Sequence, residues 1–439
     1  MKIAIVWSII IIFASNYTFS QPLADYKRDY IWHLGYDGWP QNPDYRLMSL
    51  NFATTPFTLT STYDSTGFYM ANASICDSVG NLVFQTNNVL VYDKNNRLMT
   101  ASLLNPGDWA TDPEHGYLFM QTALILPLPN SNHLYYLIHQ KINDPHAGPY
   151  SGEGLYYTIV DSNLRNGAGG VSSWRNVVVR DSFECGKLNA VRHANGRDWW
   201  VTCWQRGFTK YRLCLLDPIG LHDLGWQQLP VIPSFPNDGQ SCFSEDGSTF
   251  VAVTYNPTNN KTRIDIMDFD RCLGLLTNHR QFYTVANGYF FGLSIAPNSR
   301  YFYTCSPDIV LQYDLQATDI ANSGDTVAVY DGFRDSTYLN FLLSTQFWLA
   351  QLAADGKIYI STANGTKYLH TIESPNERGV ACNLRQHSVH LPAFMVRGLP
   401  NYPNFRLGPV DGSACDTLGF NEVNSPAHAP PETGGFIKV

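Results

Sequence analysis

Residues 244–253 read Ser244-Glu245-Asp246-Gly247-Ser248-Thr249-Phe250-Val251-Ala252-Val253, and Ile264-Asp265-Ile266-Met267-Asp268 follows after a short gap. The opening residues form a turn signal, because Asp-Gly tolerates the positive φ that a tight hairpin requires. Both runs that follow are short and rich in β-branched and aromatic residues, as β-strands are. The unit is therefore predicted to be a turn and two strands, the second of which runs into an Asp.

The same unit recurs along the chain. Clear copies open at Asn195-Gly196, Asn298-Ser299 and Asp355-Gly356, and weaker copies open at Gly80-Asn81 and Ser131-Asn132. Neighbouring turns lie roughly 50 to 65 residues apart. A fixed period of this size, built only from strands, is typical of a β-propeller in which each repeat forms one blade.

The number of blades follows from the part of the chain that the repeats cover. Six units account for roughly residues 78–375, and the flanking segments 31–70 and 376–416 have no partner of their own. Because a circular array must close, we expect these two segments to combine into one final blade. The predicted fold class is therefore all-β: a β-propeller of four-stranded blades, seven in number, with six or eight as the alternatives.

The N-terminus has the features of a secretory signal peptide. Lys2 supplies a positive charge, residues 3–14 are almost entirely apolar, and Thr18 and Ser20 are small residues in front of a cleavage point. We expect residues 1–20 to be removed and the protein to be exported. An uncleaved N-terminal anchor is the alternative, and no later segment approaches the roughly 18 apolar residues of a membrane-spanning helix.

The rest of the chain is expected to have three parts. A polar lead-in at 21–30 precedes the propeller domain at 31–416, and a flexible tail rich in Pro and Gly follows at 417–439. Hydrophobic residues make up 44% of the 439, which is enough to build a core without metal or many disulfides. The formal charge is 29 − 37 = −8, so we expect no nucleic-acid partner. We expect a monomer.

The cysteines allow two interpretations. Nine are present, and no CxxC or Cys/His spacing suggests zinc. Export permits disulfides, for which Cys203 with Cys214 and Cys382 with Cys415 are the candidate pairs. The alternative is that Cys203, Cys214 and Cys305 are small buried strand residues. The aspartates that end the second strands are interpreted as acceptors for the N–H groups of the next turn.

Several ordered segments carry a resemblance to a known family. They are Ile31-Trp32-His33-Leu34-Gly35, Gly80-Asn81-Leu82-Val83-Phe84-Gln85-Thr86-Asn87, Gln121-Thr122-Ala123-Leu124-Ile125-Leu126-Pro127, Gly154-Leu155-Tyr156-Tyr157-Thr158-Ile159-Val160-Asp161, residues 187–201, Ala353-Ala354-Asp355-Gly356-Lys357-Ile358-Tyr359-Ile360 and Arg397-Gly398-Leu399-Pro400-Asn401. Together they resemble secreted bacterial β-propeller proteins with tryptophan-aspartate-like or SPDG repeats, which are often cargo of the type IX secretion system. The resemblance implies a propeller and export, and it carries over no catalytic residues.

The same resemblance bears on location. Many of these relatives continue into a C-terminal sorting domain that directs attachment to the cell surface, whereas this sequence runs about twenty residues past Asp416. Cell-surface, periplasmic and extracellular locations are therefore all left open.

Ligands of propellers bind at a mouth of the central channel. The first candidate site contains Lys187, Arg192 and His193, which would hold an anion. The second contains Asp112, Glu114 and His115, in a loop before a predicted inner strand, where carboxylates and an imidazole suit acid–base work or a cation such as structural calcium. The alternatives are a His satisfied within its blade and a solvated loop. No cofactor and no metal ligands are predicted.

The sequence favours a binding module over an enzyme. It contains no GxSxG, SxxK or HExxH motif, so no catalytic residue is predicted. The aromatic residues Trp199, Trp200, Trp204, Tyr156 and Tyr157 would suit sugar stacking, although packing between blades is the favoured interpretation. The main hypothesis is an exported, non-enzymatic propeller that binds a protein or a glycan. The alternative is a propeller hydrolase or lyase that acts on polysaccharide.

Overall fold

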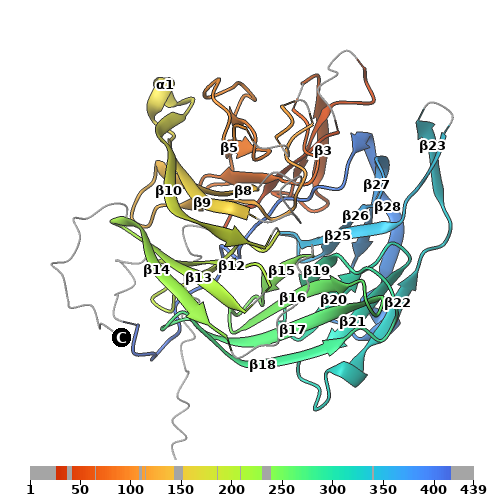
Figure 1. Cartoon of the computed structure of the whole chain (residues 1–439). Coiled ribbons are helices and arrows are strands. Elements are labelled where there is room, and N and C mark those ends of the chain that lie inside the picture. Colours follow the sequence, from red (N-terminus) through yellow and green to blue (C-terminus); the bar gives the residue numbers. More distant parts are fainter. Residues whose placement is uncertain are drawn as a thin grey trace, which may run out of the picture.

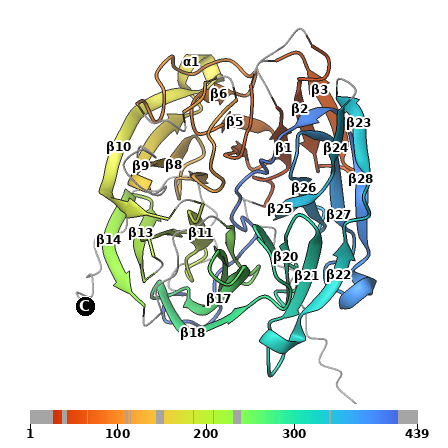
Figure 2. The same ribbon diagram turned by 45° about the vertical axis from the view of Figure 1, so that its right-hand side comes forward.

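The computed structural model describes residues 26–36, 42–64, 66–107, 111–113, 115–142, 152–184, 186–207, 209–229, 239–338 and 341–416. In this part of the chain, seven antiparallel sheets of three or four strands follow one another around a central axis (Figure 1 and Figure 2). The prediction of a seven-bladed all-β propeller is confirmed. The predicted signal peptide at 1–20 and tail at 417–439 lie outside the described residues.

The blades are numbered in chain order, and their strands have these bounds. Blade 1 contains β1 (Ile31–Leu34), β2 (Leu47–Asn51) and β3 (Thr58–Thr62), and blade 2 contains β4 (Ala73–Cys76), β5 (Leu82–Thr86) and β6 (Val91–Asp93). Blade 3 contains β7 (Ala123–Pro127), β8 (Leu134–Ile142), β9 (Gly152–Asp161) and β10 (Gly170–Phe183), and blade 4 contains β11 (Asn189–Arg192), β12 (Trp199–Trp204), β13 (Lys210–Asp217) and β14 (Gly220–Gln228).

The remaining blades have four strands each. Blade 5 contains β15 (Ser241–Phe243), β16 (Thr249–Asn256), β17 (Lys261–Asp270) and β18 (Leu275–Tyr283), and blade 6 contains β19 (Gly292–Ile295), β20 (Tyr301–Cys305), β21 (Ile309–Asp314) and β22 (Asp325–Val329). Blade 7 contains β25 (Phe347–Leu352), β26 (Ile358–Thr362), β27 (Thr366–Ile372) and β28 (Leu384–Met395). Outside the blades lie α1 (Leu164–Gly167), the 3₁₀ turns Ala321–Ser323 and Gly379–Cys382, and a hairpin of β23 (Arg334–Tyr338) and β24 (Phe341–Ser344).

The first strand of each blade lies at the axis. β1 contacts β4, β4 contacts β7, β11 contacts β15, and β15 and β25 both contact β19. These strands are short. Every residue of β4, β7, β11 and β19 is buried, whereas β15 and β25 are partly exposed. Residues at the starts and ends of these inner strands therefore line the central channel.

The expected final blade made of strands from both chain ends is not present, and that prediction is wrong. β1–β3 form a sheet by themselves, and β28 pairs with β27 inside blade 7. The ring closes by packing instead, since β28 lies against β2 and β3. One direct link is the N–H of Phe394, which donates to the carbonyl of Asp44 at 2.8 Å.

Residues 396–416, named the axial segment, leave blade 7 and cross to the opposite blades (Figure 1). Asn401 is the central link, because its N–H donates to the carbonyl of Asn72 at 2.9 Å, just before β4. Its side-chain amide donates to the carbonyls of Ala123 in β7 at 3.0 Å and Leu188 before β11 at 3.1 Å. One residue thus joins the inner strands of blades 2, 3 and 4.

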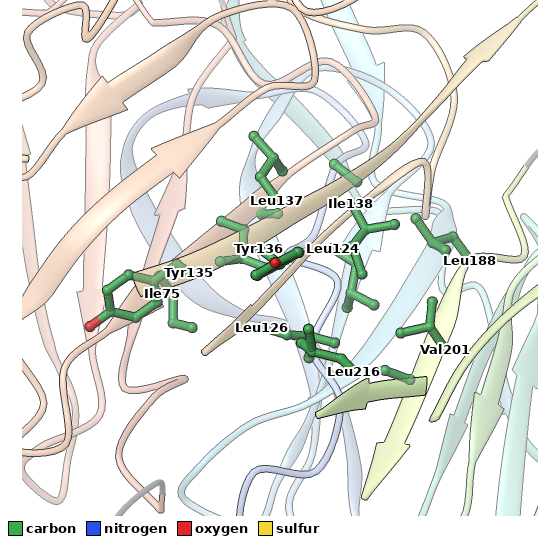
Figure 3. Close-up of a cluster of buried hydrophobic side chains, with 14 of the residues drawn as sticks. Ile75, Leu124, Leu126, Tyr135, Tyr136, Leu137, Ile138, Leu188, Val201 and Leu216 are labelled. Carbon is green, nitrogen blue, oxygen red and sulfur yellow. The ribbon is translucent and has the colours of Figure 1, made fainter. Parts of the chain in front are cut away.

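Apolar side chains pack between neighbouring blades. Figure 3 shows Ile75 of blade 2, Leu124 and Leu126 of blade 3, and Val201 and Leu216 of blade 4 in one cluster. All five are at most 2% exposed. Because each fully buried side chain of this kind contributes about 1.5–3 kcal/mol, the packing between blades is the main stabilising term of the ring.

The turn chemistry of the repeats agrees with the prediction. Asp217, at the end of β13, accepts the N–H groups of Ile219 at 2.8 Å and Gly220 at 3.1 Å. Asp314, at the end of β21, does the same for the N–H group of Gln316 at 2.9 Å, whereas Asp268 of β17 instead accepts the side-chain amide of Asn278 at 2.8 Å. These carboxylates are structural, as interpreted from the sequence.

The cysteines differ from the pairs considered in the sequence. The disulfide joins Cys272 to Cys415, so both predicted pairings are wrong. Cys203 lies opposite Arg212 and not opposite Cys214, while Cys382 is a free, buried thiol. The alternative interpretation is confirmed for Cys203, Cys214 and Cys305, which are free and fully buried.

Candidate binding site at the propeller axis

Lys187 links two blades. It is fully buried just before β11, and its ammonium group donates to the carbonyls of Gly239 at 2.9 Å and Val253 at 3.0 Å. The carbonyls lie before β15 and in β16, so the ammonium group ties blade 4 to blade 5. This cation is therefore surrounded by main-chain oxygen atoms and packed inside the propeller.

Arg192 lies at the other end of β11 and has different partners. Its guanidinium group lies 3.9 Å from the ring centroid of Trp199 and donates to the carbonyls of Arg197 at 3.0 Å and Phe405 at 3.4 Å. Because Lys187 and Arg192 bind separate sets of carbonyls, the two cations do not converge on one anion site. Ligand binding by either residue stays a prediction.

His193 is satisfied within its own turn. Its Nδ1 accepts the N–H of Asn195 at 3.0 Å, and its ring lies against Trp200 with centroids 5.0 Å apart. Burial lowers the pKa of His193, against the smaller opposing effect of Asp198. A neutral imidazole that already accepts a hydrogen bond adds little to an anion site.

The second predicted site is partly described. The carboxylate of Asp112 lies 2.8 Å from Nδ1 of His115 and also accepts the N–H of His115 at 3.1 Å. Glu114 lies outside the described residues. The structure thus brings Asp112 and His115 together as a half-exposed pair within one loop. Acid–base work or cation binding at this pair stays a prediction.

The aromatic residues are largely core. Trp199, Trp200 and Trp204 are at most 5% exposed, so none of them offers a face to a sugar. Tyr156 and Tyr157 are half-buried and stack on His139 and Tyr136, respectively. Packing within and between blades, the favoured interpretation, is confirmed for the three tryptophans.

A pocket opens at the axis beside the axial segment. Its cavity volume is about 40 Å³ and it is partly open to solvent, so it admits a few water molecules or the polar head of a ligand. Its lining comes from the inner strands of blades 4 to 7, from Gln121 and from the axial segment. The lining residues are Gln121, Asn189, Ala190, Val191, Gln240, Cys242, Phe243, Ser244, Glu245, Leu293, Ser294, Ile295, Gln351, Leu352, Tyr402, Pro403 and Asn404.

Two buried amides line the pocket at the starts of the inner strands. Gln121 exchanges two hydrogen bonds with the backbone of Ser241, one donated at 2.8 Å and one accepted at 2.9 Å. Gln240 donates to the carbonyl of Ala350 at 3.1 Å and accepts the N–H groups of Leu293 at 3.0 Å and Ala350 at 2.9 Å. These amides span the channel and join blades 3, 5, 6 and 7.

Glu245 lies at the opposite end of the pocket, in the turn after β15. Asn404 of the axial segment donates to its backbone carbonyl at 2.7 Å. In the described part of the chain, no hydrogen bond or ion pair is made to its carboxylate. Burial raises the pKa of Glu245 to about 7, against the attraction of Arg406 and with a further rise from Asp29 and Asp246. A carboxylic acid that changes charge near neutral pH therefore faces the pocket.

Sequence reasoning missed this site. Glu245 stands in the quoted turn, where a polar residue is expected at the surface. Gln121 and Gln240 begin similar segments, Gln-Thr-Ala and Gln-Ser-Cys, and each stands just before an inner strand. That shared position is a usable signal, because an amide there reaches the channel.

Among the described residues, no three His, Cys, Asp or Glu side chains gather closely enough to hold a metal ion. The expected structural calcium stays a prediction. Within the same residues, no helix combines the length and apolar character needed to cross a membrane.

Comparison with known proteins gives similarity in shape only. No protein-family model matches the chain, and no curated protein matches its sequence. Similar solved structures include a protein from Lactobacillus plantarum (13% identity, TM-score 0.47, 85% of this chain and 99% of that one) and one from Desulfotomaculum acetoxidans (10%, 0.47, 85% and 99%). A luciferin-regenerating enzyme is also similar (11%, 0.36, 88% and 98%). At these identities and scores, none of the similarities carries an argument about ligand or activity.

Proposed function

We propose that this chain is an exported, non-enzymatic binding propeller, and that its ligand occupies the axial pocket. The observation that carries the proposal is the unpartnered carboxyl group of Glu245 inside a pocket otherwise lined by amides, hydroxyls and apolar groups. The amide and hydroxyl groups of the lining offer hydrogen bonds to a small polar ligand, and small-molecule sites use such groups to fix the orientation of the ligand. Export is supported by the signal-like segment at 1–20.

The number of carboxyl groups on the pocket wall favours a binding function over glycoside hydrolysis. Hydrolysis with either stereochemical outcome uses two carboxyl groups roughly 5–10 Å apart. Among the described residues that line the pocket, Glu245 is the only Asp or Glu. A ligand bound there would meet one carboxyl group and no second one on the pocket wall.

A polysaccharide-cleaving enzyme is the second candidate. The observation in its favour is the pKa of Glu245, because a carboxyl group raised to about 7 is suited to donate a proton near neutral pH. Release of reducing ends from polysaccharides that is lost in Glu245→Gln would favour this candidate over the binding module.

The binding proposal is tested with a glycan array and a thermal-shift screen of small metabolites on the secreted chain. Gln351→Trp places a large ring at a half-buried position of the pocket wall, whereas Gln316→Trp adds the same ring to an exposed turn and serves as the matched control. We expect one or more compounds that bind the wild type and Gln316→Trp but not Gln351→Trp. Binding that Gln351→Trp leaves intact would contradict the proposal, and a protein partner would then be sought.

A further inference from the structure

We propose that the axial pocket selects ligands that carry a protonated amine, which forms an ion pair with the carboxylate of Glu245. This inference rests on the proposed function and names the chemical class of the ligand. It depends on three features of the described residues: a carboxylate with no partner among them, a cation that is already paired, and a pocket wall in which none of them carries a positive charge.

Arg406, the cation that attracts Glu245, is already engaged in an ion pair with another carboxylate. The guanidinium group of Arg406 binds Asp29 at two points, with Nη1 at 2.8 Å from Oδ1 and Nη2 bonded to Oδ2. Nη1 also donates to the carbonyl of Tyr26 at 3.0 Å. Since Asp29 is 2% exposed, this two-point ion pair is anchored in the fold and its charges offset each other.

Charges of both signs surround Glu245, and the cations among them already have other hydrogen-bond partners. Asp246, next to Glu245, is held as an anion by the hydroxyls of Ser244 and Ser248. The guanidinium group of Arg271 is committed to main-chain carbonyls, including that of Arg192 at 2.8 Å. Two carboxylates, Asp29 and Asp246, thus act on Glu245 together with Arg406, which is already paired.

The other titratable side chains of the wall are neutral near pH 7. Burial raises the pKa of the Cys242 thiol, with Glu245 adding to the rise, and burial also raises the pKa of the Tyr402 phenol. In the part of the chain that the structure describes, no Lys, Arg or His lines the pocket. An anionic ligand would therefore meet repulsion, whereas an ammonium group would meet an unpaired carboxylate.

A ligand amine would also find hydrogen-bonding neighbours. The hydroxyl of Ser294 lines the pocket without a protein partner in the described part of the chain. The amide of Gln351 donates only to the carbonyl of Leu352, at 3.1 Å. The oxygen atoms of these two side chains can accept hydrogen bonds in the same pocket, as an ammonium group with several N–H donors requires.

Ion-pair formation has a measurable consequence for protons. An ammonium group beside Glu245 favours the ionised carboxylate, so its pKa falls when the ligand binds. With a pKa of about 7 in the free protein, roughly half a proton is released per ligand bound at pH 7. The affinity is expected to rise about tenfold from pH 6 to pH 8, because the ionised fraction rises by that factor.

The test is isothermal titration calorimetry with matched pairs of probes. N-methylglucamine is compared with glucitol, ethanolamine with ethylene glycol, and putrescine with 1,4-butanediol, at pH 6 and pH 8 and in two buffers of different ionisation enthalpy. We expect the amine of at least one pair to bind at least tenfold more tightly than its neutral partner, with proton release at pH 7. Equal binding within every pair, or no binding by any amine, would overturn the inference.

Two variants separate this inference from the proposed function. Glu245→Gln keeps the shape of the side chain and should remove the amine preference and the proton release, while Glu377→Gln removes one exposed carboxylate elsewhere and should change neither. Gln351→Trp should abolish binding of every pocket ligand. If neutral compounds lose binding in Gln351→Trp while Glu245→Gln has no effect on any ligand, the pocket is a binding site but the amine preference is wrong.

Discussion

Cys415 is joined by a disulfide to Cys272, which lies in the turn between β17 and β18 of blade 5. The bond closes a loop of 143 residues and fastens the end of the axial segment to blade 5. Because the axial segment contributes Tyr402, Pro403 and Asn404 to the pocket, the disulfide also stabilises one wall of the candidate site.

Loss of this disulfide is predicted to destabilise the propeller. Cys415→Ser should lower the free energy of unfolding by about 2–4 kcal/mol, since the cross-link restricts a long loop in the unfolded chain. Urea unfolding measured with and without reductant checks the prediction. Reductant should lower the urea midpoint of the wild type to that of Cys415→Ser. It should leave the urea midpoint of Cys415→Ser unchanged. A wild-type midpoint that equals that of Cys415→Ser without reductant would contradict the role given to the bond.

Gly247 is predicted to be intolerant of a side chain. Its φ is +72°, and a Cβ atom there would lie 2.7 Å from Leu407 and 2.8 Å from Arg271. Gly247→Val should therefore cost roughly 1–3 kcal/mol from backbone strain, with the steric overlap in addition. Gly356 has a φ of +80° but nothing within 4 Å of the added atom, so Gly356→Val carries the strain alone.

The comparison of these two glycine variants is made by thermal unfolding. The melting temperature should fall further for Gly247→Val than for Gly356→Val. Equal losses would mean that the axial segment does not pack on the β15–β16 turn, and an unchanged melting temperature for Gly247→Val would refute the turn itself.

Glu245 is predicted to make stability depend on pH. Its pKa rises from 4.5 in the unfolded chain to about 7 in the folded protein. Between these values the unfolded chain loses the proton while the folded protein keeps it, so stability falls as the pH rises from about 4.5 to 7. The loss approaches about 3 kcal/mol above pH 7. Glu245→Gln should therefore be more stable than the wild type at pH 8 and equally stable near pH 4.

Urea midpoints of Glu245→Gln and wild type at several pH values measure this difference. Glu377→Gln is the control, because it removes an exposed carboxylate with the same change in net charge. A difference between Glu245→Gln and wild type that does not vary with pH would show that the pKa of Glu245 is ordinary.

Three buried histidines are predicted to limit stability in acid. Burial lowers the pKa of His33 and His370 to about 4 and that of His139 to about 3. As the pH falls below 6.5, the unfolded chain takes up protons that the folded protein excludes, so stability present above pH 6.5 is lost towards pH 4. Imidazole resonances followed by NMR should not titrate above about pH 5 at these positions. Titration near pH 6.5 would contradict their burial.

The blades could be predicted from the sequence because the turn and the strands of each blade are close together in the chain. The unit at 244–268 predicts β16 and β17 with their connecting geometry, and the same local signals recur in the other copies. Closure of the ring, in contrast, depends on contacts between residues that are far apart in the sequence. β28 could pair either with the N-terminal segment or with β27, and only the packed structure selects the second.

The candidate site was not predictable for a similar reason. Gln121 and Ser241 are 120 residues apart, and Gln240 and Ala350 are 110 apart, so no short motif records their contacts. The cations that the sequence does mark, Lys187 and Arg192, are committed to main-chain carbonyls. Which polar residue faces the channel depends on the curvature of the ring, which a single sequence does not encode at any one position.

The central claim is that the axial pocket is where this propeller binds its ligand. The most direct measurement is a crystal structure of the chain with the tightest-binding compound from the screen. The account predicts ligand density in the pocket, within about 3 Å of a Glu245 carboxylate oxygen. Density for the compound elsewhere on the propeller, with the pocket empty of it, would contradict the account.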